Sequence, residues 1–360
     1  MLPTSKENYV EQRGNTYIFN DKNIDRSYAS TTKQISQQAQ LFVKNVELII
    51  ADKKIDIICA ENFPVGLPPA FSILLSVAAV QHKIPIVLHM HSFTISDVQT
   101  ELVNQLMWNK ISCVSKSIAG DCFQKGADID LISTDYLGVN TDIFHKSIDA
   151  NNYVRKDLNI SQNEKVIMTA TRIIQGRKNI LEAKGLVVLI QAFSRISPHH
   201  PEIKLLIAVG KAPDRLNSEF EQAREMLMGY IKLHNITKKT IVKTFPMKEI
   251  PEAYRAANVF VLASENETFG QVFTEAMSSG VPVIGTKVGG IPEIISDTRN
   301  GYLIQPNDSS ILAQKIEKLI YDEPIRDEFI KAGLDSVKRK FALKMQLDNF
   351  IDNLTKNVNE

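Results

Sequence analysis

Residues Glu265–Gly290 have the sequence ENETFGQVFTEAMSSGVPVIGTKVGG. Two glutamates, Glu267 and Glu275, stand eight positions apart on either side of Phe269-Gly270. A helix that begins just after the glycine would carry Glu275 in its early turns and leave Glu267 in the preceding loop. The first turn of a helix presents unpaired backbone N–H groups and a partial positive charge. The stretch therefore predicts a ligand site at a helix N-terminus, flanked by two carboxylates.

The type of ligand follows from the groups that this site offers. Gly270 lets a ligand come close to the backbone, because glycine has no Cβ. In open α/β sheets, ligands bind in the crevice between a strand end and the next helix. Carboxylates accept hydrogen bonds from hydroxyl groups, so the site suits a ligand with both phosphate and hydroxyl groups, such as a sugar nucleotide. The alternative is that Glu267 and Glu275 only favour the helix dipole and face solvent.

Strand-like and helical patterns alternate on both sides of this stretch. Continuous apolar runs are typical of strands that are buried on both faces. The predicted strands cover residues 55–62, 84–91, 110–115, 130–138, 166–173, 203–210, 240–245, 258–264, 281–286 and 301–305. In the first half, the predicted helices cover residues 31–52, 68–82, 98–108 and 116–125. The alternation predicts an α/β protein with parallel sheets and helices on both faces.

Composition and length exclude several classes of protein. The 360 residues are 44% hydrophobic and 23% charged, with a net charge of +1, so no nucleic-acid partner is expected. No apolar run reaches the roughly 18 residues of a membrane span. The three cysteines have no paired spacing, which favours free thiols in a reducing cytoplasm. We expect domains at residues 1–155 and 156–335, followed by a C-terminal helix at 336–360 that packs back on the first domain.

Two basic residues are candidates for binding a diphosphate. Arg172 ends a predicted strand and Lys184 opens a later helix. Fixed cations stabilise the negative charge that develops on a leaving diphosphate. Arg177 or Lys178, in the loop between them, could take the place of either. The alternative is that Arg172 and Lys184 are both solvated surface charges.

The stretch from Arg172 to Gly301 resembles the retaining glycosyltransferases of family GT4, which have the GT-B fold. That family has two glutamates separated by seven residues within E-x-F-G-x-x-x-x-E-A-M-x-x-G-x-P-V, and residues 267–283 fit this pattern throughout. The following GGIPEII at residues 289–295 also matches. The resemblance covers roughly residues 55–345, strongly in the second half and thinly in the first.

This resemblance implies roles for the residues of the pattern. Glu275 would bind the ribose hydroxyl groups of the donor, and Glu267 would hold the transferred sugar. Arg172 and Lys184 match the diphosphate-binding pair of the family. The backbone N–H groups expected to contact sugar or phosphate belong to Phe269, Gly270 and Gln271.

The resemblance also implies the chemistry. The family transfers a sugar with retention of configuration, by front-face attack in which the leaving phosphate helps to deprotonate the acceptor. This mechanism needs no enzyme nucleophile, no metal and no other cofactor. The family often has a histidine at the position of His91, close to the transferred sugar. The expected catalytic residues are therefore His91, Glu267, Arg172 and Lys184, although a strand-end histidine is more often structural.

The N-terminal part departs from the family pattern. Family members begin with a strand, a glycine-rich loop and a helix, whereas Gly14 is the only glycine here before Gly66. We expect this first unit to be missing or replaced. A further motif, Asp128-Ile-Asp130, spells the D-x-D pair that binds a metal in GT-A transferases. It lies beside a predicted strand, so we interpret it as loop charge.

The sequence thus predicts a GT-B protein with two Rossmann-like domains that face each other across a cleft. The second would bind a nucleotide-sugar donor, and the first would bind a glycan, lipid-linked or small-molecule acceptor. The main hypothesis is a cytoplasmic retaining glycosyltransferase of glycan, polysaccharide or glycoconjugate synthesis. An option within this hypothesis is peripheral contact with the inner membrane surface through Trp108. The second is a nucleotide-sugar-binding subunit or pseudoenzyme that needs a partner chain. A sugar-nucleotide epimerase would require additional first-domain acids, which the sequence does not show.

Overall fold

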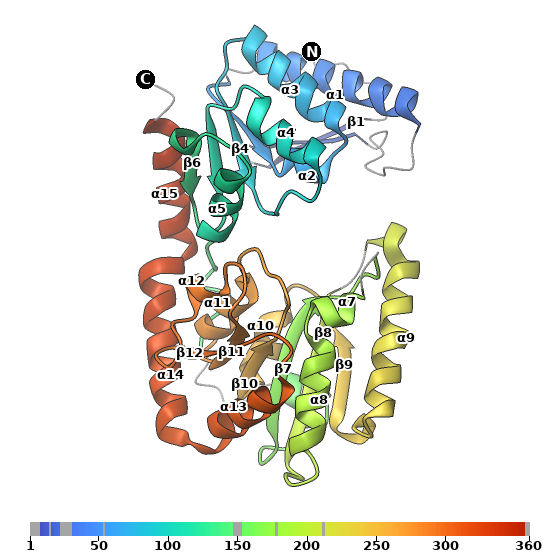
Figure 1. Cartoon of the computed structure of the whole chain (residues 1–360), viewed down its shortest axis with the longest axis vertical. Helices are drawn as coiled ribbons and strands as arrows, with labels where there is room; N and C mark the ends of the chain where they lie inside the picture. Colours follow the sequence, from blue (N-terminus) through green and yellow to red (C-terminus); the bar gives the residue numbers. More distant parts are fainter. Residues whose placement is uncertain are drawn as a thin grey trace. The chain divides into compact units, whose positions relative to one another are not determined.

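The computed structural model describes residues 8–13, 16–21, 31–52, 55–146, 153–176, 179–210 and 213–356. The chain forms two compact units (Figure 1). Unit 1 comprises Met1–Asp135 and Phe350–Glu360, and unit 2 comprises Tyr136–Asn349. The domain limits expected at residues 155 and 335 stay predictions, and the compact units are divided after Asp135 and after Asn349.

In the described part of unit 2, six strands form one sheet in which every pairing is parallel. The strands are β7 (Lys165–Arg172), β8 (Ile203–Gly210), β9 (Thr240–Thr244), β10 (Val259–Leu262), β11 (Val283–Thr286) and β12 (Gly301–Ile304). Their order is β12-β11-β10-β7-β8-β9. Read from β9, this is the doubly wound 3-2-1-4-5-6 arrangement, whose order reverses between β7 and β10. A ligand crevice is expected beyond the carboxyl ends of these two strands.

Helices cover this sheet because their apolar faces match its buried surfaces. In α8, for example, Leu189, Phe193 and Ile196 point into the core, and α8 packs beside α13. Burying one such side chain contributes about 1.5–3 kcal/mol. The helices of unit 2 are α6 (Tyr153–Asp157), α7 (Ile180–Ala183), α8 (Leu186–Ile196), α9 (Asn217–Leu233), α10 (Ile250–Arg255), α11 (Gln271–Ser278), α12 (Ile291–Ile294), α13 (Ser309–Tyr321), α14 (Glu323–Ser336) and a π-helical turn (Val337–Phe341). A last helix, α15 (Leu343–Lys356), begins in unit 2 and ends in unit 1.

Unit 1 has a second parallel sheet, with the order β3-β4-β5-β6. Serine caps begin two of its helices: Ser96 accepts a hydrogen bond from Gln99 N, and Ser115 accepts one from Ile118 N. The strands are β3 (Ile58–Glu61), β4 (Ile86–Met90), β5 (Lys110–Cys113) and β6 (Ile132–Thr134). The helices are α1 (Thr32–Asp52), α2 (Phe63–Gly66), α3 (Pro69–Gln81), α4 (Asp97–Gln105) and α5 (Lys116–Gln124).

The N-terminal region contains an antiparallel hairpin of β1 (Asn8–Arg13) and β2 (Thr16–Asp21). The final residues of the chain group with unit 1, where the Phe350 ring packs against His89 at 4.9 Å and Asn353 contacts Asp135.

Trp108 does not provide the expected surface contact. It is 4% exposed, and its indole Nε1 donates a hydrogen bond to Leu102 O at 3.0 Å. The side chain is part of the core of unit 1 and is not free to contact a membrane, so the option of a contact through Trp108 was wrong. Among the described residues, no helix combines the length and the apolar character that crossing a membrane requires.

Candidate functional site

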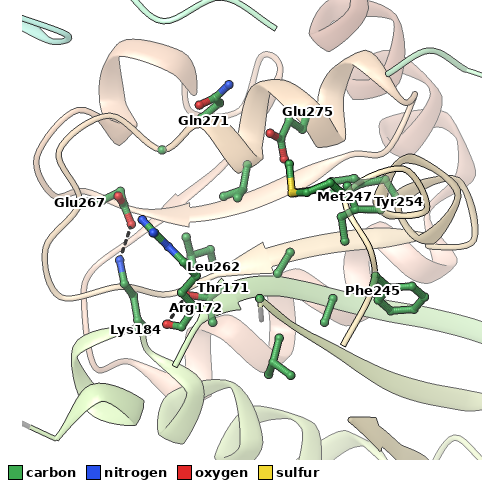
Figure 2. Close-up of a pocket in the computed structure, with 17 residues that line it drawn as sticks. Thr171, Arg172, Lys184, Phe245, Met247, Tyr254, Leu262, Glu267, Gln271 and Glu275 are labelled. Carbon is green, nitrogen blue, oxygen red and sulfur yellow. Dashed lines mark hydrogen bonds and ion pairs between the residues drawn. The ribbon is translucent and has the colours of Figure 1, made fainter. Parts of the chain in front are cut away.

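A cavity of about 410 Å³ opens in unit 2 at the carboxyl ends of the central strands, where the strand order reverses (Figure 2). Its walls come from the ends of β7, β8 and β10, from α10 and from the first turns of α11. Its lining residues are Ala170, Thr171, Arg172, Lys184, Ala208, Val209, Gly210, Phe245, Met247, Ile250, Tyr254, Leu262, Glu267, Gly270, Gln271, Val272 and Glu275. The cavity thus lies where doubly wound sheets bind their ligands.

The start of α11 forms one wall of this cavity and depends on glycine. Gly270 has φ +98°, and a Cβ there would stand 2.9 Å from the Phe273 ring. Among the described residues, no side chain caps this helix. Its first N–H groups are therefore directed at the cavity wall, together with the positive end of the helix dipole.

The loop that carries Glu267 is fixed by the glycine pair 289–290. Gly290 N donates a hydrogen bond to Glu267 O at 3.0 Å. Gly289 has φ +50°, and a Cβ there would lie only 1.8 Å from the same carbonyl oxygen. The second glycine motif of the sequence therefore holds the first acid of the site in place.

An ion pair crosses the cavity between the predicted cation and the predicted acid. Lys184 Nζ lies 3.1 Å from Glu267 Oε2, and the two side chains are 28% and 17% exposed (Figure 2). Arg172, at the end of β7, extends its guanidinium group toward this pair. No described residue forms an ion pair with Arg172, so this side chain is available to an anionic ligand.

The second acid, Glu275, has a different environment. Its Oε2 accepts a hydrogen bond from the hydroxyl of Tyr254 at 2.8 Å. Burial raises the pKa of Glu275 to about 7, against the opposing effect of this hydrogen bond. Tyr254 is fully buried, and its pKa is raised well above the ordinary value by burial and by the nearby carboxylate.

The structure therefore brings six predicted residues to one cavity. They are Arg172, Lys184, Glu267, Gly270, Gln271 and Glu275. Phe269 is not among them, because its ring is 2% exposed and packs between Tyr136 and Phe341, each with a centroid 5.9 Å away. Arg177 and Lys178 lie outside the described residues.

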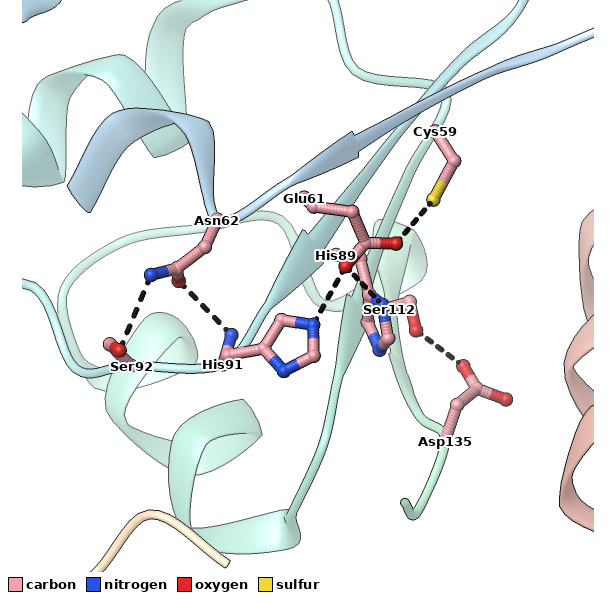
Figure 3. Close-up of polar contacts among 8 residues, drawn as sticks. All are labelled: Cys59, Glu61, Asn62, His89, His91, Ser92, Ser112 and Asp135. Carbon is pink, nitrogen blue, oxygen red and sulfur yellow. Dashed lines mark hydrogen bonds and ion pairs between the residues drawn. The ribbon is translucent and has the colours of Figure 1, made fainter. Parts of the chain in front are cut away.

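His91 belongs to unit 1 and sits in a separate polar cluster (Figure 3). Its Nε2 lies 2.7 Å from Glu61 Oε2, and His89 Nδ1 lies 3.0 Å from the same oxygen. Partial burial alone would raise the pKa of Glu61, but hydrogen bonds from His89 and His91 outweigh burial and hold the pKa well below its ordinary value. Glu61 therefore accepts hydrogen bonds from both rings through one oxygen, which orients the two histidines.

The sequence argument missed Glu61 and Tyr254. The signal for Glu61 was available: Cys59 and Glu61 alternate on β3, His89 lies on the next strand and His91 directly follows that strand, and Glu61 pairs with His89 in register. Residues two positions apart in a strand point to the same face of the sheet, so the side chains of the C-x-E pattern and of the H-x-H pattern are expected to lie close together. Nothing in the sequence linked Tyr254 to Glu275, because the contact depends on how α10 packs against α11.

Two further features bear on metal binding. The ligand atoms of Cys59, Glu61 and His89 lie within 4.8 Å of one another, a spacing that would admit a metal ion. Coordination through His89 Nδ1 would move its proton to Nε2, which is buried and has no partner among the described residues. In the present arrangement Glu61 accepts hydrogen bonds from Cys59 and His89. Asp128 of the D-x-D motif accepts a hydrogen bond from Asp130 N at 3.0 Å and caps a short 3₁₀ turn, as expected for loop charge.

Comparison with known proteins defines the class. Residues 155–335, half of the chain, match the model of the family described as glycosyl transferases group 1. The chain belongs to this family of glycosyltransferases. It is 25% identical to N-acetyl-alpha-D-glucosaminyl L-malate synthase of Bacillus anthracis, over 82% of this chain and 75% of that protein. It is also 27% identical to D-inositol 3-phosphate glycosyltransferase of Corynebacterium diphtheriae, over 58% of this chain and 47% of that protein.

Solved structures agree on the fold. Anabaena Alr3699/HepE in complex with UDP and glucose superposes with a TM-score of 0.76 at 20% identity, covering 92% of this chain and 84% of that one. A glycosyltransferase from Rickettsia africae also gives 0.76 at 20% identity, with 93% and 84% coverage. The prediction of an α/β GT-B fold with two Rossmann-like parts is confirmed.

Proposed function

We propose that this glycosyltransferase moves a sugar from a nucleotide-diphosphate sugar to an acceptor hydroxyl with retention of configuration. Glycan, polysaccharide or glycoconjugate synthesis is the proposed setting. The observation that carries the proposal is the grouping of Arg172, Lys184, Glu267 and Glu275 around one cavity at the N-terminus of α11. This grouping offers cations for a diphosphate and carboxylates for hydroxyl groups.

Donor binding would rearrange the ion pair. The diphosphate takes contacts with Lys184 and Arg172, and Glu267 then accepts hydrogen bonds from the hydroxyl groups of the sugar. The N–H groups at the start of α11 face the sugar or the phosphate. Glu275 accepts hydrogen bonds from the ribose of the donor through its oxygen that Tyr254 does not hold.

The chemical step then follows from where charge develops. The bond between the anomeric carbon and the diphosphate oxygen breaks, and the acceptor oxygen bonds to that carbon from the same face. The acceptor proton passes to the departing phosphate, which yields a glycoside and a nucleoside diphosphate. Lys184 and Arg172 stabilise the charge on the leaving group, a role that a metal would otherwise fill. The proposal therefore requires no metal and no other cofactor.

His91 and the cytoplasmic location are part of the same proposal. His91 would contact the transferred sugar, and its ring is oriented by Glu61. The described cysteines Cys59, Cys113 and Cys122 are free thiols, which supports a reducing compartment.

The second candidate is a nucleotide-sugar-binding subunit that needs a partner chain for turnover. The observation in its favour is the scarcity of glycine before Gly66, where Gly14 stands alone. A glycine-rich loop in that region would let the backbone approach a diphosphate. The two candidates share the cavity in unit 2 and differ in whether the isolated chain turns over.

One experiment separates these candidates. Binding and hydrolysis of UDP-, GDP- and ADP-sugars would be measured on the purified chain by calorimetry and by release of nucleoside diphosphate. Binding with slow hydrolysis of one donor is expected and would name that donor. Binding without any hydrolysis would favour the subunit, and an absence of binding across the whole panel would contradict both.

A further inference from the structure

Tyr254 is a buried residue that the donor-binding scheme does not yet use. It lies on α10, is 0% exposed, and packs its ring against Phe260 at 5.4 Å and Phe144 at 5.9 Å between centroids. Tyr254 is nevertheless one of the residues around the cavity, and its hydroxyl donates a hydrogen bond to Glu275, the predicted ribose-binding acid. The ring is therefore held in the core, while its hydroxyl group contacts Glu275.

The contact fixes one half of the Glu275 carboxylate. Oε2 accepts from the Tyr254 hydroxyl at 2.8 Å, and Glu275 is partly exposed to the cavity. A hydrogen bond to a charged acceptor is stronger than one between neutral groups, so it holds the side chain in a single orientation. The second oxygen is then directed to accept hydrogen bonds from a ligand.

The same contact acts on the charge of Glu275. Burial disfavours the carboxylate, whereas a donated hydrogen bond favours it. The other charged groups that line the cavity are Arg172, Lys184 and Glu267, and the last two are paired with each other. Tyr254 is therefore the group on the neighbouring helix that directly stabilises the carboxylate form of Glu275.

We propose that Tyr254 is a positioning residue that favours the carboxylate form of Glu275 and aims it at the hydroxyl groups of the nucleoside. The inference rests on the proposed function, because it gives Glu275 the ribose of a nucleotide sugar as its ligand. The two hydroxyl groups of the ribose donate hydrogen bonds, so they need Glu275 as an acceptor. A protonated carboxyl group would instead present a donor of its own to these hydroxyl groups. Tyr254 therefore determines the pH range over which the donor binds.

The test compares Tyr254→Phe with two matched variants. Tyr302→Phe is the control, because Tyr302 is also buried in unit 2, at 4% exposure, and packs on Phe329 with no hydroxyl hydrogen bond to a described residue. Glu275→Gln removes the titrating group, and the double variant Tyr254→Phe/Glu275→Gln asks whether Tyr254 acts through it. Two quantities are measured between about pH 5.5 and pH 8.5: the infrared carboxyl band of Glu275 without donor, and the affinity for the UDP-, GDP- or ADP-sugar that the wild type binds.

For Tyr254→Phe we expect the Glu275 titration and the midpoint of donor binding to shift upward by about one pH unit, which weakens binding about tenfold below the midpoint. Affinity should recover at the alkaline end, and kcat should change less than KM. Tyr302→Phe should leave both curves in place. In the Glu275→Gln background, Tyr254→Phe should have no further effect.

Two results would overturn the inference: an equal loss of affinity at every pH, or an equal loss in the Glu275→Gln background. Either would assign Tyr254 to the core alone. If Tyr254→Phe does not fold, 3-fluorotyrosine placed at position 254 keeps the ring, strengthens the donor and should shift both curves downward. If the wild type binds no nucleotide sugar, the proposed function fails, whereas the infrared titration still decides whether Tyr254 controls Glu275.

Discussion

At the scale of single residues, Lys184 is the side chain with the clearest double role. It neutralises Glu267 within the protein and would receive the diphosphate of the donor. We expect Lys184→Ala to lower kcat/KM by a factor of about 10²–10³, because one fixed cation is lost from the leaving group. Steady-state kinetics with the donor identified in the binding panel would measure this loss.

The matched control for that variant is Lys204→Ala. Lys204 pairs with Glu164 at 3.3 Å, with side chains 24% and 21% exposed, so its burial resembles that of the Lys184 pair. It does not line the cavity. Comparable losses from both lysines would indicate a general effect of charge or stability and would contradict the role given to Lys184.

Glu275 leads to a prediction about stability and pH. Its pKa is about 7 in the folded protein, against 4.5 for an ordinary glutamate. Below about pH 4.5 the Glu275 carboxyl group is protonated in both the folded and the unfolded state. As the pH rises toward 7, this group ionises first in the unfolded state, so the folded state loses stability. Relative to Glu275→Gln, the wild type should therefore lose about 3 kcal/mol of unfolding free energy by pH 8.

Urea unfolding of both proteins across this pH range would measure the difference. Glu164→Gln supplies a control of opposite sign. Burial would raise the pKa of Glu164, but hydrogen bonds from Ser161 and Lys204 outweigh it and lower the pKa. That carboxylate contributes stability that is lost on acidification, so the glutamine variant should be less stable than the wild type at neutral pH. A stability gain for Glu275→Gln that did not grow with pH would contradict the assignment.

At the scale of elements, the glycine pair after β11 determines how accurately the loop before α11 is held. Gly289→Ala should place a Cβ on Glu267 O, displace that loop and weaken donor binding by at least about tenfold. Gly229→Ala is the control, because a Cβ at this exposed position of α9 meets nothing within 4 Å. That change should stabilise the protein by about 0.5–1 kcal/mol and leave binding unchanged. Calorimetric titration and thermal unfolding would test both variants.

The sequence predicted these elements unevenly, for physical reasons. Strands such as β8 were predicted at their observed limits, because a strand buried on both faces requires an unbroken apolar run. Strand β10 proved shorter than its apolar run, since Ala263 and Ser264 are buried but lie beyond the last paired residue, Leu262. Strand β1 was not predicted, because NYVEQR carries little apolar pattern. Contacts between distant segments, such as Tyr254 with Glu275, could not be read from local patterns at all.

At the scale of the whole molecule, segments near the two unit boundaries meet at the loop that carries Glu267. Tyr136, the first residue of unit 2, stacks on Phe269 at 5.9 Å and 29°. Phe341 packs on the same ring, and Val139 pairs with Ala342 in a parallel bridge. Lys340 lies 4.6 Å from the centre of the Tyr136 ring. The loop that carries Glu267 is thus supported by residues more than seventy positions away on either side.

We therefore expect Tyr136→Ala to weaken donor binding although Tyr136 does not line the cavity. Losing one face of the aromatic stack should cost about 0.5–1.5 kcal/mol of its packing and loosen the loop. Donor affinity should fall about three- to tenfold, while Tyr136→Phe, which keeps the ring, should bind normally. Equal affinity for Tyr136→Ala and wild type would show that the stack does not support the site.

The pairing of Lys184 with Glu267 has a consequence for what the cavity rejects. Inorganic phosphate could satisfy the ammonium group, but it would leave the carboxylate without its partner in a poorly solvated place. A free sugar could donate hydrogen bonds to the carboxylate, but it would leave the ammonium group without its partner in the same way. An unpaired buried charge is unfavourable, so inorganic phosphate alone or a free sugar alone would bind less favourably. If the proposed function holds, we therefore expect the Lys184–Glu267 pair to favour a ligand that carries both phosphate and hydroxyl groups over metabolites that carry only one of them.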